Sequence, residues 1–162
     1  MLTGDQKSLY LLQKGSGIDL TSDTNIMEAW NNLRSSSNDK SINWLLITIK
    51  DGTSIANLLS SGNNGINEMI SFMNDDNIYY GSIKINLKSG GSKYYHFSLI
   101  GSNVSGMKKG KSSMYKAGIF KYLDGNHGEI PSFTDGITSI SRDVIIEQVI
   151  KLSRIDESDI VL

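Results

Sequence analysis

The sequence predicts a single α/β domain in which helices pack against a mixed β-sheet. Two turn-like tetrapeptides, residues 50–53 (KDGT) and 88–91 (KSGG), each join two runs rich in β-branched and aromatic residues, a pattern typical of β-hairpins. Segments with apolar residues at helical spacing precede, separate and follow these hairpins. At 162 residues the chain is long enough to bury about 70% of its unfolded surface around one core. Hairpins flanked by helices therefore indicate a mixed sheet covered by helices.

The boundaries of the elements follow from their end signals. Asn25 followed by Glu28 resembles a capping box at the start of the first helix. Gly125 is expected just after the end of a lysine-rich segment, the basic helix, because glycine is common at that position. Pro131 has no N–H to donate, so the short strand that contains it is expected at the edge of the sheet. In chain order we expect a helix before the polar break at 35–39, strands at 43–49 and 54–59, a helix at 66–73, strands at 78–87 and 93–100, the basic helix, a short strand at 128–133 and a helix at 142–154.

Composition excludes several classes of site. The chain has no cysteine, which excludes disulfides, thiolate metal sites and cysteine nucleophiles. The longest apolar run, residues 44–47, is far shorter than the roughly 20 residues that span a bilayer. Asp5 and Lys7 precede a short apolar patch at 8–12, which is a poor secretory signal. We therefore expect a cytosolic protein without a transmembrane segment.

Positive charge is concentrated on the basic helix of a chain whose net charge is only −1. Such local charge indicates a local acidic partner, whereas a strongly basic chain would favour diffuse attraction to nucleic acid. Met107 and Met114, seven residues apart, place adaptable apolar side chains beside the charges. Gly106, Gly110 and Gly118 weaken the helix, which suits either a backbone that a partner approaches closely or a helix with an irregular start. The lysines of this helix are Lys108, Lys109, Lys111, Lys116 and Lys121.

No motif for catalysis or for a cofactor emerges from the sequence. Residues 106–112 (GMKKGKS) lie where a phosphate-binding loop would lie, between a strand and a helix, but the loop is one residue too short for its amides to curl around phosphates. The two histidines, His96 and His127, lie on different elements without carboxylates at metal-ligand spacing, and we interpret His96 as a packed or half-exposed strand residue. No serine stands in a Gly-x-Ser-x-Gly turn. We therefore expect neither an enzyme nor a metal site nor a cofactor.

Two segments of the second hairpin and the basic helix resemble a known family. Residues 92–94 (SKY) and 101–107 (GSNVSGM) are similar to the fourth strand and helix start of coactosin-like proteins, in which Ser-Lys-Phe leads through an apolar strand to Gly-Glu-Asn-Val-Ser-Gly-Leu. Weaker similarity extends over residues 17–154, including 51–55 (DGTSI). Coactosins belong to the ADF/cofilin-homology (ADF-H) family, and the resemblance implies its gelsolin-like fold, a mixed sheet of five or six strands sandwiched by helices. It divides the chain into an N-terminal extension (1–16), a single ADF-homology domain (17–154) and a C-terminal tail (155–162).

The resemblance also implies actin binding. In this family the long third helix enters the groove between actin subdomains, and basic residues near the fourth strand and the final helix contact a second subunit of the filament. We therefore expect a monomeric cytoplasmic protein of the cytoskeleton that binds the side of actin filaments. The residues that match the family's contacts are Lys93 on the strand, Met107, Lys108, Lys109, Lys111 and Lys116 on the basic helix, and Lys151 on the last helix.

The chain departs from the coactosin pattern at several positions, which keeps other functions open. Leu99 stands where coactosins usually carry tryptophan, Ser102 replaces an acidic residue, and the hairpin turn before Lys93 is shorter. A shorter turn favours an ADF-H module that regulates another partner, such as the actin-branching complex, as glia maturation factors do. Severing or depolymerisation in the manner of cofilin is a further alternative. A remote one is binding to anionic lipids such as phosphoinositides, because anionic head groups attract any basic helix.

Overall fold

The computed structural model describes residues 17–35 and 41–161. In these residues one sheet has the strand order β2-β1-β3-β4-β5. The three junctions between β2, β1, β3 and β4 are antiparallel and the β4–β5 junction is parallel, so the predicted mixed sheet is confirmed. The strands are β1 (Trp44–Ile49), β2 (Ala56–Gly62), β3 (Ile78–Asn86), β4 (Ser92–Ile100) and β5 (Gly128–Glu129).

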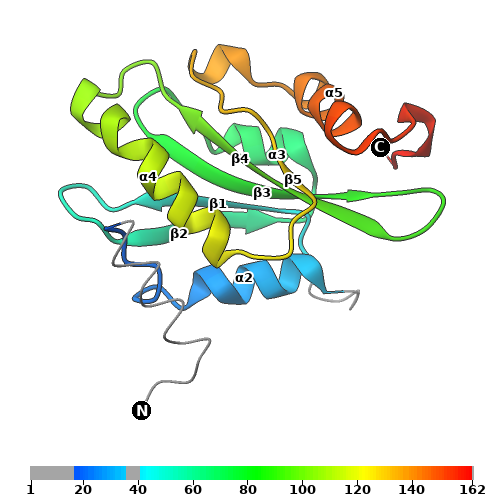
Figure 1. The fold of residues 1–162 in the computed structure, drawn as a ribbon, viewed down its shortest axis with the longest axis horizontal. Helices are drawn as coiled ribbons and strands as arrows, with labels where there is room; N and C mark the ends of the chain where they lie inside the picture. The colour runs from blue at the N-terminus through cyan, green and yellow to red at the C-terminus, as the bar shows by residue number, and fades with distance from the viewer. Residues whose placement is uncertain (1–16, 36–40, 162) are drawn as a thin grey trace.

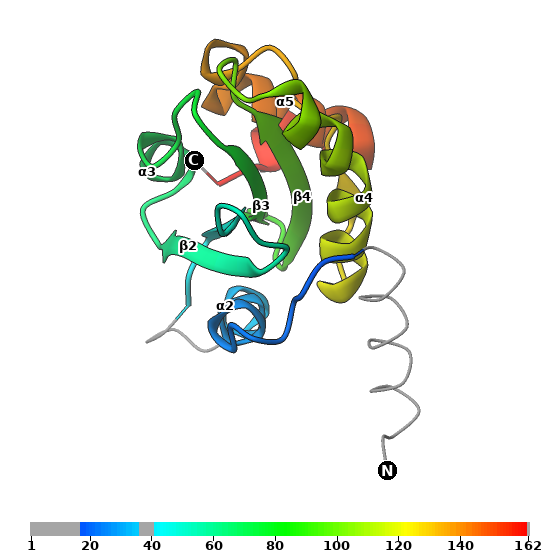
Figure 2. The ribbon, with the colours of Figure 1, turned by 90° about the vertical axis from the view of Figure 1, so that its left-hand side faces the viewer.

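Helices cover both faces of this sheet, as Figures 1 and 2 show. Helices α2 and α4 pack on one face, and α3 and α5 pack on the other. None of the described helices is both long and apolar enough to cross a membrane. The helices are α2 (Asn25–Arg34), α3 (Ile66–Ser71), α4 (Gly106–Tyr122) and α5 (Arg142–Ser153), with short 3₁₀ turns η1 (Ile137–Ser139) and η2 (Glu157–Asp159).

Strand β1 is buried on both faces because it lies inside the sheet between two helical layers. Successive side chains of a strand point to opposite faces. Leu45 and Ile47 accordingly join the core beneath α2 and α4, whereas Trp44 and Leu46 join the core beneath α3 and α5. This explains why residues 44–47 of β1 form a continuous apolar run and not an alternating one.

His96 is a packed core residue on β4, as the sequence predicts. It is fully buried, and its ring lies 4.9 Å from that of Trp30 and 4.8 Å from that of Phe120. Nε2 lies 2.8 Å from the Leu123 carbonyl oxygen, which can only accept a hydrogen bond, so Nε2 carries the proton. Nδ1 then accepts from the Ser82 hydroxyl at 2.6 Å. Burial lowers the pKa of His96 from 6.5 to about 4, so the ring is neutral at pH 7.

The start of α2 differs from the prediction, and so does β2. The predicted capping box is wrong, because Asn25 is already helical and no side chain caps from Thr24. The Asp23 carboxylate instead accepts hydrogen bonds from the N–H groups of Asn25 (2.9 Å) and Leu58 (2.8 Å), which ties α2 to β2. Strand β2 begins at Ala56 instead of residue 54, because the backbone around residues 54–56 pairs with Asp19.

The edge strand β5 is shorter than the predicted range 128–133. It has two residues and pairs in parallel with β4 at the edge of the sheet. The edge position agrees with the prediction from Pro131, which has no N–H to donate. Beyond the proline the chain continues along β4: the N–H of Phe133 donates to the Ser98 carbonyl at 2.9 Å, and that of Ile100 donates to the Phe133 carbonyl at 2.8 Å.

The segment that the sequence assigns to a C-terminal tail packs against the β3–β4 hairpin over residues 155–161. Ile160 is buried in the core and bridges to Leu87. The Asp159 carboxylate accepts hydrogen bonds from the N–H and the hydroxyl of Ser89, both at 2.7 Å. These contacts brace the turn of the hairpin that precedes Lys93. The predicted extension, residues 1–16, lies outside the described residues.

Candidate functional site

Helix α4 has a buried face and a basic, exposed face. Tyr115, Ile119 and Phe120 pack on the sheet, which directs the lysines toward solvent. Met107 is 77% exposed and Met114 is 47% exposed, so both methionines lie on the outer surface as the sequence analysis suggested. Exposed methionines beside lysines offer a partner apolar area and positive charge on the same surface.

The start of α4 is held in place by a network centred on Asp75. The Asp75 carboxylate accepts from the N–H of Ile137 at 2.8 Å and from that of Ser102 at 3.2 Å, and its backbone carbonyl accepts from Asn103 at 2.9 Å. These hydrogen bonds lower the pKa of Asp75. Gly101 packs so closely on the Asp75 backbone that a Cβ would come within 2.3 Å of its carbonyl oxygen. Three loops distant in sequence are thereby joined where α4 begins.

Only one lysine of α4 has an acidic partner among the described residues. Lys108 Nζ lies 3.2 Å from Asp51 Oδ1 in the β1–β2 turn. The two side chains are 57% and 84% exposed, so this ion pair contributes well under about 1 kcal/mol to stability and can open easily. Within the described chain Lys109, Lys111, Lys116 and Lys121 make no ion pair, so the charge of this face is largely uncompensated.

The seven residues that the resemblance assigns to actin binding do not form one cluster. Met107 and its neighbouring lysines lie at the end of the molecule where α4 begins, which is the end where β4 stops. Lys93 is half-buried near the start of β4, opposite Ile85 of β3. Lys151 is near the same end, because the Tyr95 hydroxyl is hydrogen-bonded to Ser153 at the end of α5. The structure therefore shows two basic regions, at the two ends of β4.

Lys116 and Lys151 differ in how they are held. Lys116 is half-buried in the second half of α4 and has no ion pair with a described residue. Lys151 forms an exposed i,i+4 pair with Glu147 at 3.2 Å, which is worth only a few tenths of a kcal/mol, so its ammonium can exchange partners.

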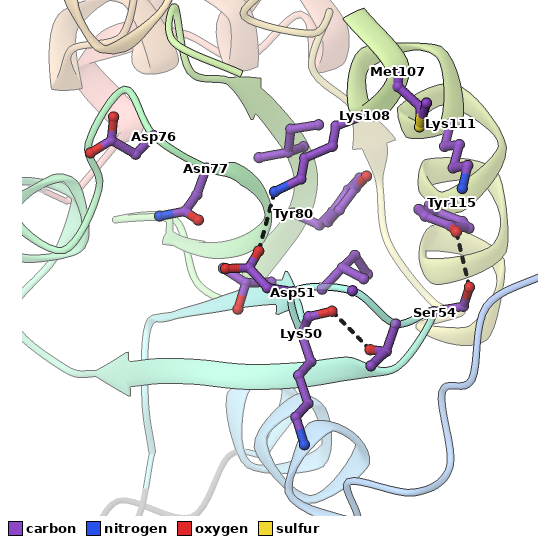
Figure 3. Close-up of a pocket in the computed structure, with 15 residues that line it drawn as sticks. Lys50, Asp51, Ser54, Asp76, Asn77, Tyr80, Met107, Lys108, Lys111 and Tyr115 are labelled. Atoms are coloured by element: carbon purple, nitrogen blue, oxygen red, sulfur yellow. Dashed lines mark hydrogen bonds and ion pairs between the residues drawn. The ribbon is translucent and has the colours of Figure 1, made fainter. Parts of the chain in front are cut away.

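A cavity that sequence reasoning missed lies beside the first half of α4. Its volume is about 350 Å³, and it is open to solvent and bounded by α4, the β1–β2 turn and residues 76–78 (Figure 3). Tyr80 and Tyr115 line it, and the Tyr115 hydroxyl is hydrogen-bonded to the Ser54 hydroxyl at 3.1 Å. These residues come from three elements separated by more than 20 positions, so no local pattern could have indicated the cavity.

The described part of the chain has no cluster suited to a metal ion. It contains no group of three or more His, Asp or Glu side chains positioned to bind one. His127 is separate from His96, and its Nδ1 accepts a hydrogen bond from the Tyr94 N–H at 3.0 Å. What the site offers is a set of lysines and methionines on the outer face of α4.

Comparisons with known proteins agree with the fold described above and indicate a family. The sequence profile of a family described as cofilin/tropomyosin-type actin-binding protein matches residues 19–149. No curated protein sequence matches the chain. Several solved structures share its fold, at sequence identities too low to show more than the fold.

Three of these structures are coactosins or a coactosin-like protein. Coactosin from Entamoeba histolytica has a TM-score of 0.70 at 15% identity, covering 86% of this chain and 99% of that one. Human coactosin-like protein has a TM-score of 0.68 at 18% identity, with 85% and 99% covered. Mouse coactosin, described as an actin filament binding protein, has a TM-score of 0.64 at 17% identity, with 83% and 91% covered. The resemblance to coactosins and the ADF-H fold are thereby confirmed.

Proposed function

Since the chain belongs to the family of cofilin/tropomyosin-type actin-binding proteins, we propose that it binds the sides of actin filaments in the manner of coactosin. The observation that carries this proposal is the exposed face of α4, where lysines without acidic partners among the described residues surround two exposed methionines. The similarity to mouse coactosin, an actin filament binding protein, supports filaments as the partner.

The first half of α4 supplies the proposed primary contact. Met107 inserts as an adaptable apolar anchor, and Lys108, Lys109 and Lys111 form charge-assisted hydrogen bonds with acidic side chains of actin. Lys108 exchanges Asp51 for an actin carboxylate, which the weakness of the exposed ion pair permits. The Asp75 network holds the helix start before the partner arrives, so less ordering entropy is lost on binding.

The second basic region supplies the proposed contact to a neighbouring actin subunit. Lys93 and Lys151 lie at the opposite end of β4 from Met107, and Lys116 lies in the second half of α4. Two separated basic regions suit a filament, which presents two subunits, better than they suit a single monomer. Asp159 braces the short hairpin turn before Lys93, which supports a fixed position for this second region.

The proposed activity is binding alone, by a monomer associated with the cytoskeleton in the cytoplasm. It involves no chemical step and no cofactor. Regulation of the branching complex, cofilin-like disassembly and attachment to phosphoinositides are the competing functions that the experiments must separate.

The experiment that tests the assignment of residues is co-sedimentation of a double variant with filamentous actin. Lys93→Gln combined with Lys116→Gln removes one charge from the start of β4 and one from the second half of α4, and we expect affinity to fall at least several-fold. The matched control is Lys50→Gln combined with Arg142→Gln, which removes the same charge from the β1–β2 turn and the start of α5. Equal pelleting of both double variants and the wild type would show that the interface lies elsewhere.

Lipid attachment is distinguished by its dependence on salt. Attraction of the lysines to phosphoinositide vesicles rests on charge alone and should vanish as ionic strength rises. Actin binding includes the apolar contact of Met107 and should persist in part. Binding that disappears equally from vesicles and filaments would favour non-specific electrostatic attraction.

A further inference from the structure

We propose that the cavity between α4 and the β1–β2 turn is a binding site for a small organic anion with a flat apolar body, such as an aromatic carboxylate. Its volume of about 350 Å³ lies within the range of small-molecule sites and is large enough for a fused two-ring acid. This binding does not depend on the proposed interaction with actin.

The wall of the cavity suits a flat apolar body. Ile49 and Ile78 are half-buried, and the residues Tyr80 and Tyr115 are more than nine-tenths buried. Aromatic walls favour stacked or edge-on contacts with another ring. A ligand that fills this space would shield the exposed parts of Ile49, Ile78 and Met107 from water, which is the main source of affinity in such a site.

Two phenols give the cavity polar groups that can orient a ligand. The Tyr80 hydroxyl has one long hydrogen bond, 3.5 Å from the Ser112 carbonyl oxygen, so most of its hydrogen-bonding capacity is unused. Burial raises the pKa of Tyr80, so the hydroxyl keeps its proton and can donate it. The Tyr115 hydroxyl is held by Ser54 and marks the other side of the cavity.

The charges around the cavity favour an anion. Three lysines (Lys50, Lys108 and Lys111) line the cavity against two carboxylates, of which Asp51 already pairs with Lys108. Asp76 keeps its charge and accepts a hydrogen bond from the Asn103 amide at 3.0 Å. Lys111 lines the cavity and has no ion pair with a described residue. Figure 3 shows Lys108 reaching across the cavity to Asp51 and Lys50 pointing away from it.

Lys108 can take part as well as Lys111. Its pair with Asp51 is exposed and weak, so a carboxylate in the cavity can replace Asp51 as its partner. A bound anion would then lie between two lysines one helical turn apart on α4. A cation in the same place would face both ammonium groups and be repelled.

The test is a titration of the ¹⁵N-labelled protein with three probes of the same shape, followed by NMR. The probes are 2-naphthoate, the neutral 2-naphthylmethanol and the cationic 2-naphthylmethylamine. We expect saturable shifts at amides that line the cavity, among them Ile78 and Lys111, with affinity decreasing from acid to alcohol to amine. The proposal is overturned if the acid binds no more tightly than the alcohol, or if no probe shifts these amides.

Two variants test which charged side chains affect binding of the anion, and a third variant serves as the control. Lys111→Gln should weaken 2-naphthoate binding several-fold, whereas Asp51→Asn should strengthen it, because it removes a negative charge from the rim and releases Lys108. Lys121→Gln makes the same chemical change on the last turn of α4, away from the cavity, and should leave the affinity unchanged. An equal loss in Lys111→Gln and Lys121→Gln would contradict the site. Actin is absent from this experiment, so its result is independent of the proposed filament binding.

Discussion

Replacing Gly110 with alanine adds one methyl group to α4 and tests both the stability of this helix and its role as a binding face. Gly110 lies inside α4 on the exposed side, and a Cβ built there would meet nothing within 4 Å. Alanine is more favourable than glycine inside an exposed helix by about 1 kcal/mol. Gly110→Ala should therefore stabilise the protein by about that amount and raise the Tm by about 2–4 °C.

The same methyl group should weaken binding to actin filaments. It would project beside Met107 and Met114, which are one turn away on either side along the proposed contact surface. Thermal unfolding and co-sedimentation with filamentous actin would be measured on the same preparation. A lower Tm would show that the description of α4 is wrong at this position. A higher Tm with unchanged filament affinity would refute the idea that actin approaches the α4 backbone closely at Gly110.

Two further predictions concern groups that hold the fold. Because the pKa of His96 falls from 6.5 to about 4 on folding, the unfolded chain binds the proton more readily between these values, and stability should decrease by about 3 kcal/mol as pH falls through this window. An NMR titration in which the His96 ring titrates near 6.5 would contradict this. Asp75→Ala should lower the Tm and speed hydrogen exchange at the amides of Ser102 and Ile137, which lose their acceptor. Unchanged exchange at both amides would show that the Asp75 network does not hold the start of α4.

The parts of the fold that local chemistry determines were predictable from the sequence. The two hairpins follow from glycine-containing turns at 50–53 and 88–91, and Gly90 and Gly91 adopt the positive φ angles that such turns favour. The exposure of Met107 and Met114 follows from helical periodicity once Tyr115 and Ile119 are assigned to the core.

The errors arose where distant residues compete for backbone groups. Nothing near Asn25 indicates that Asp23 accepts from Leu58 on another element, or that Asp19 pairs with the start of the predicted second strand. Likewise, no local pattern indicates that Ile160, in the segment assigned to the tail, packs in the core. Such contacts depend on the tertiary arrangement, which periodicity and propensity do not encode.

The candidate site shows the same contrast between residues of one segment, which were predicted, and contacts between segments, which were not. The lysines and methionines of α4 were found because they lie within one continuous segment. The partner of Lys108, the Asp75 network and the cavity were missed, because each joins residues from separate loops: Asp51 is 57 positions from Lys108, and Asp75 is 62 positions from Ile137. Sequence reasoning thus identified the charged surface but not the groups that position it.

The most direct test of filament binding is co-sedimentation of the wild-type protein with filamentous actin at two salt concentrations. We expect saturable pelleting that weakens at the higher salt concentration but persists, because Met107 adds an apolar contact to the charges of α4. Protein that stays in the supernatant while actin remains filamentous would contradict binding to filament sides. Loss of actin itself from the pellet would also contradict it and would indicate cofilin-like disassembly or monomer capture.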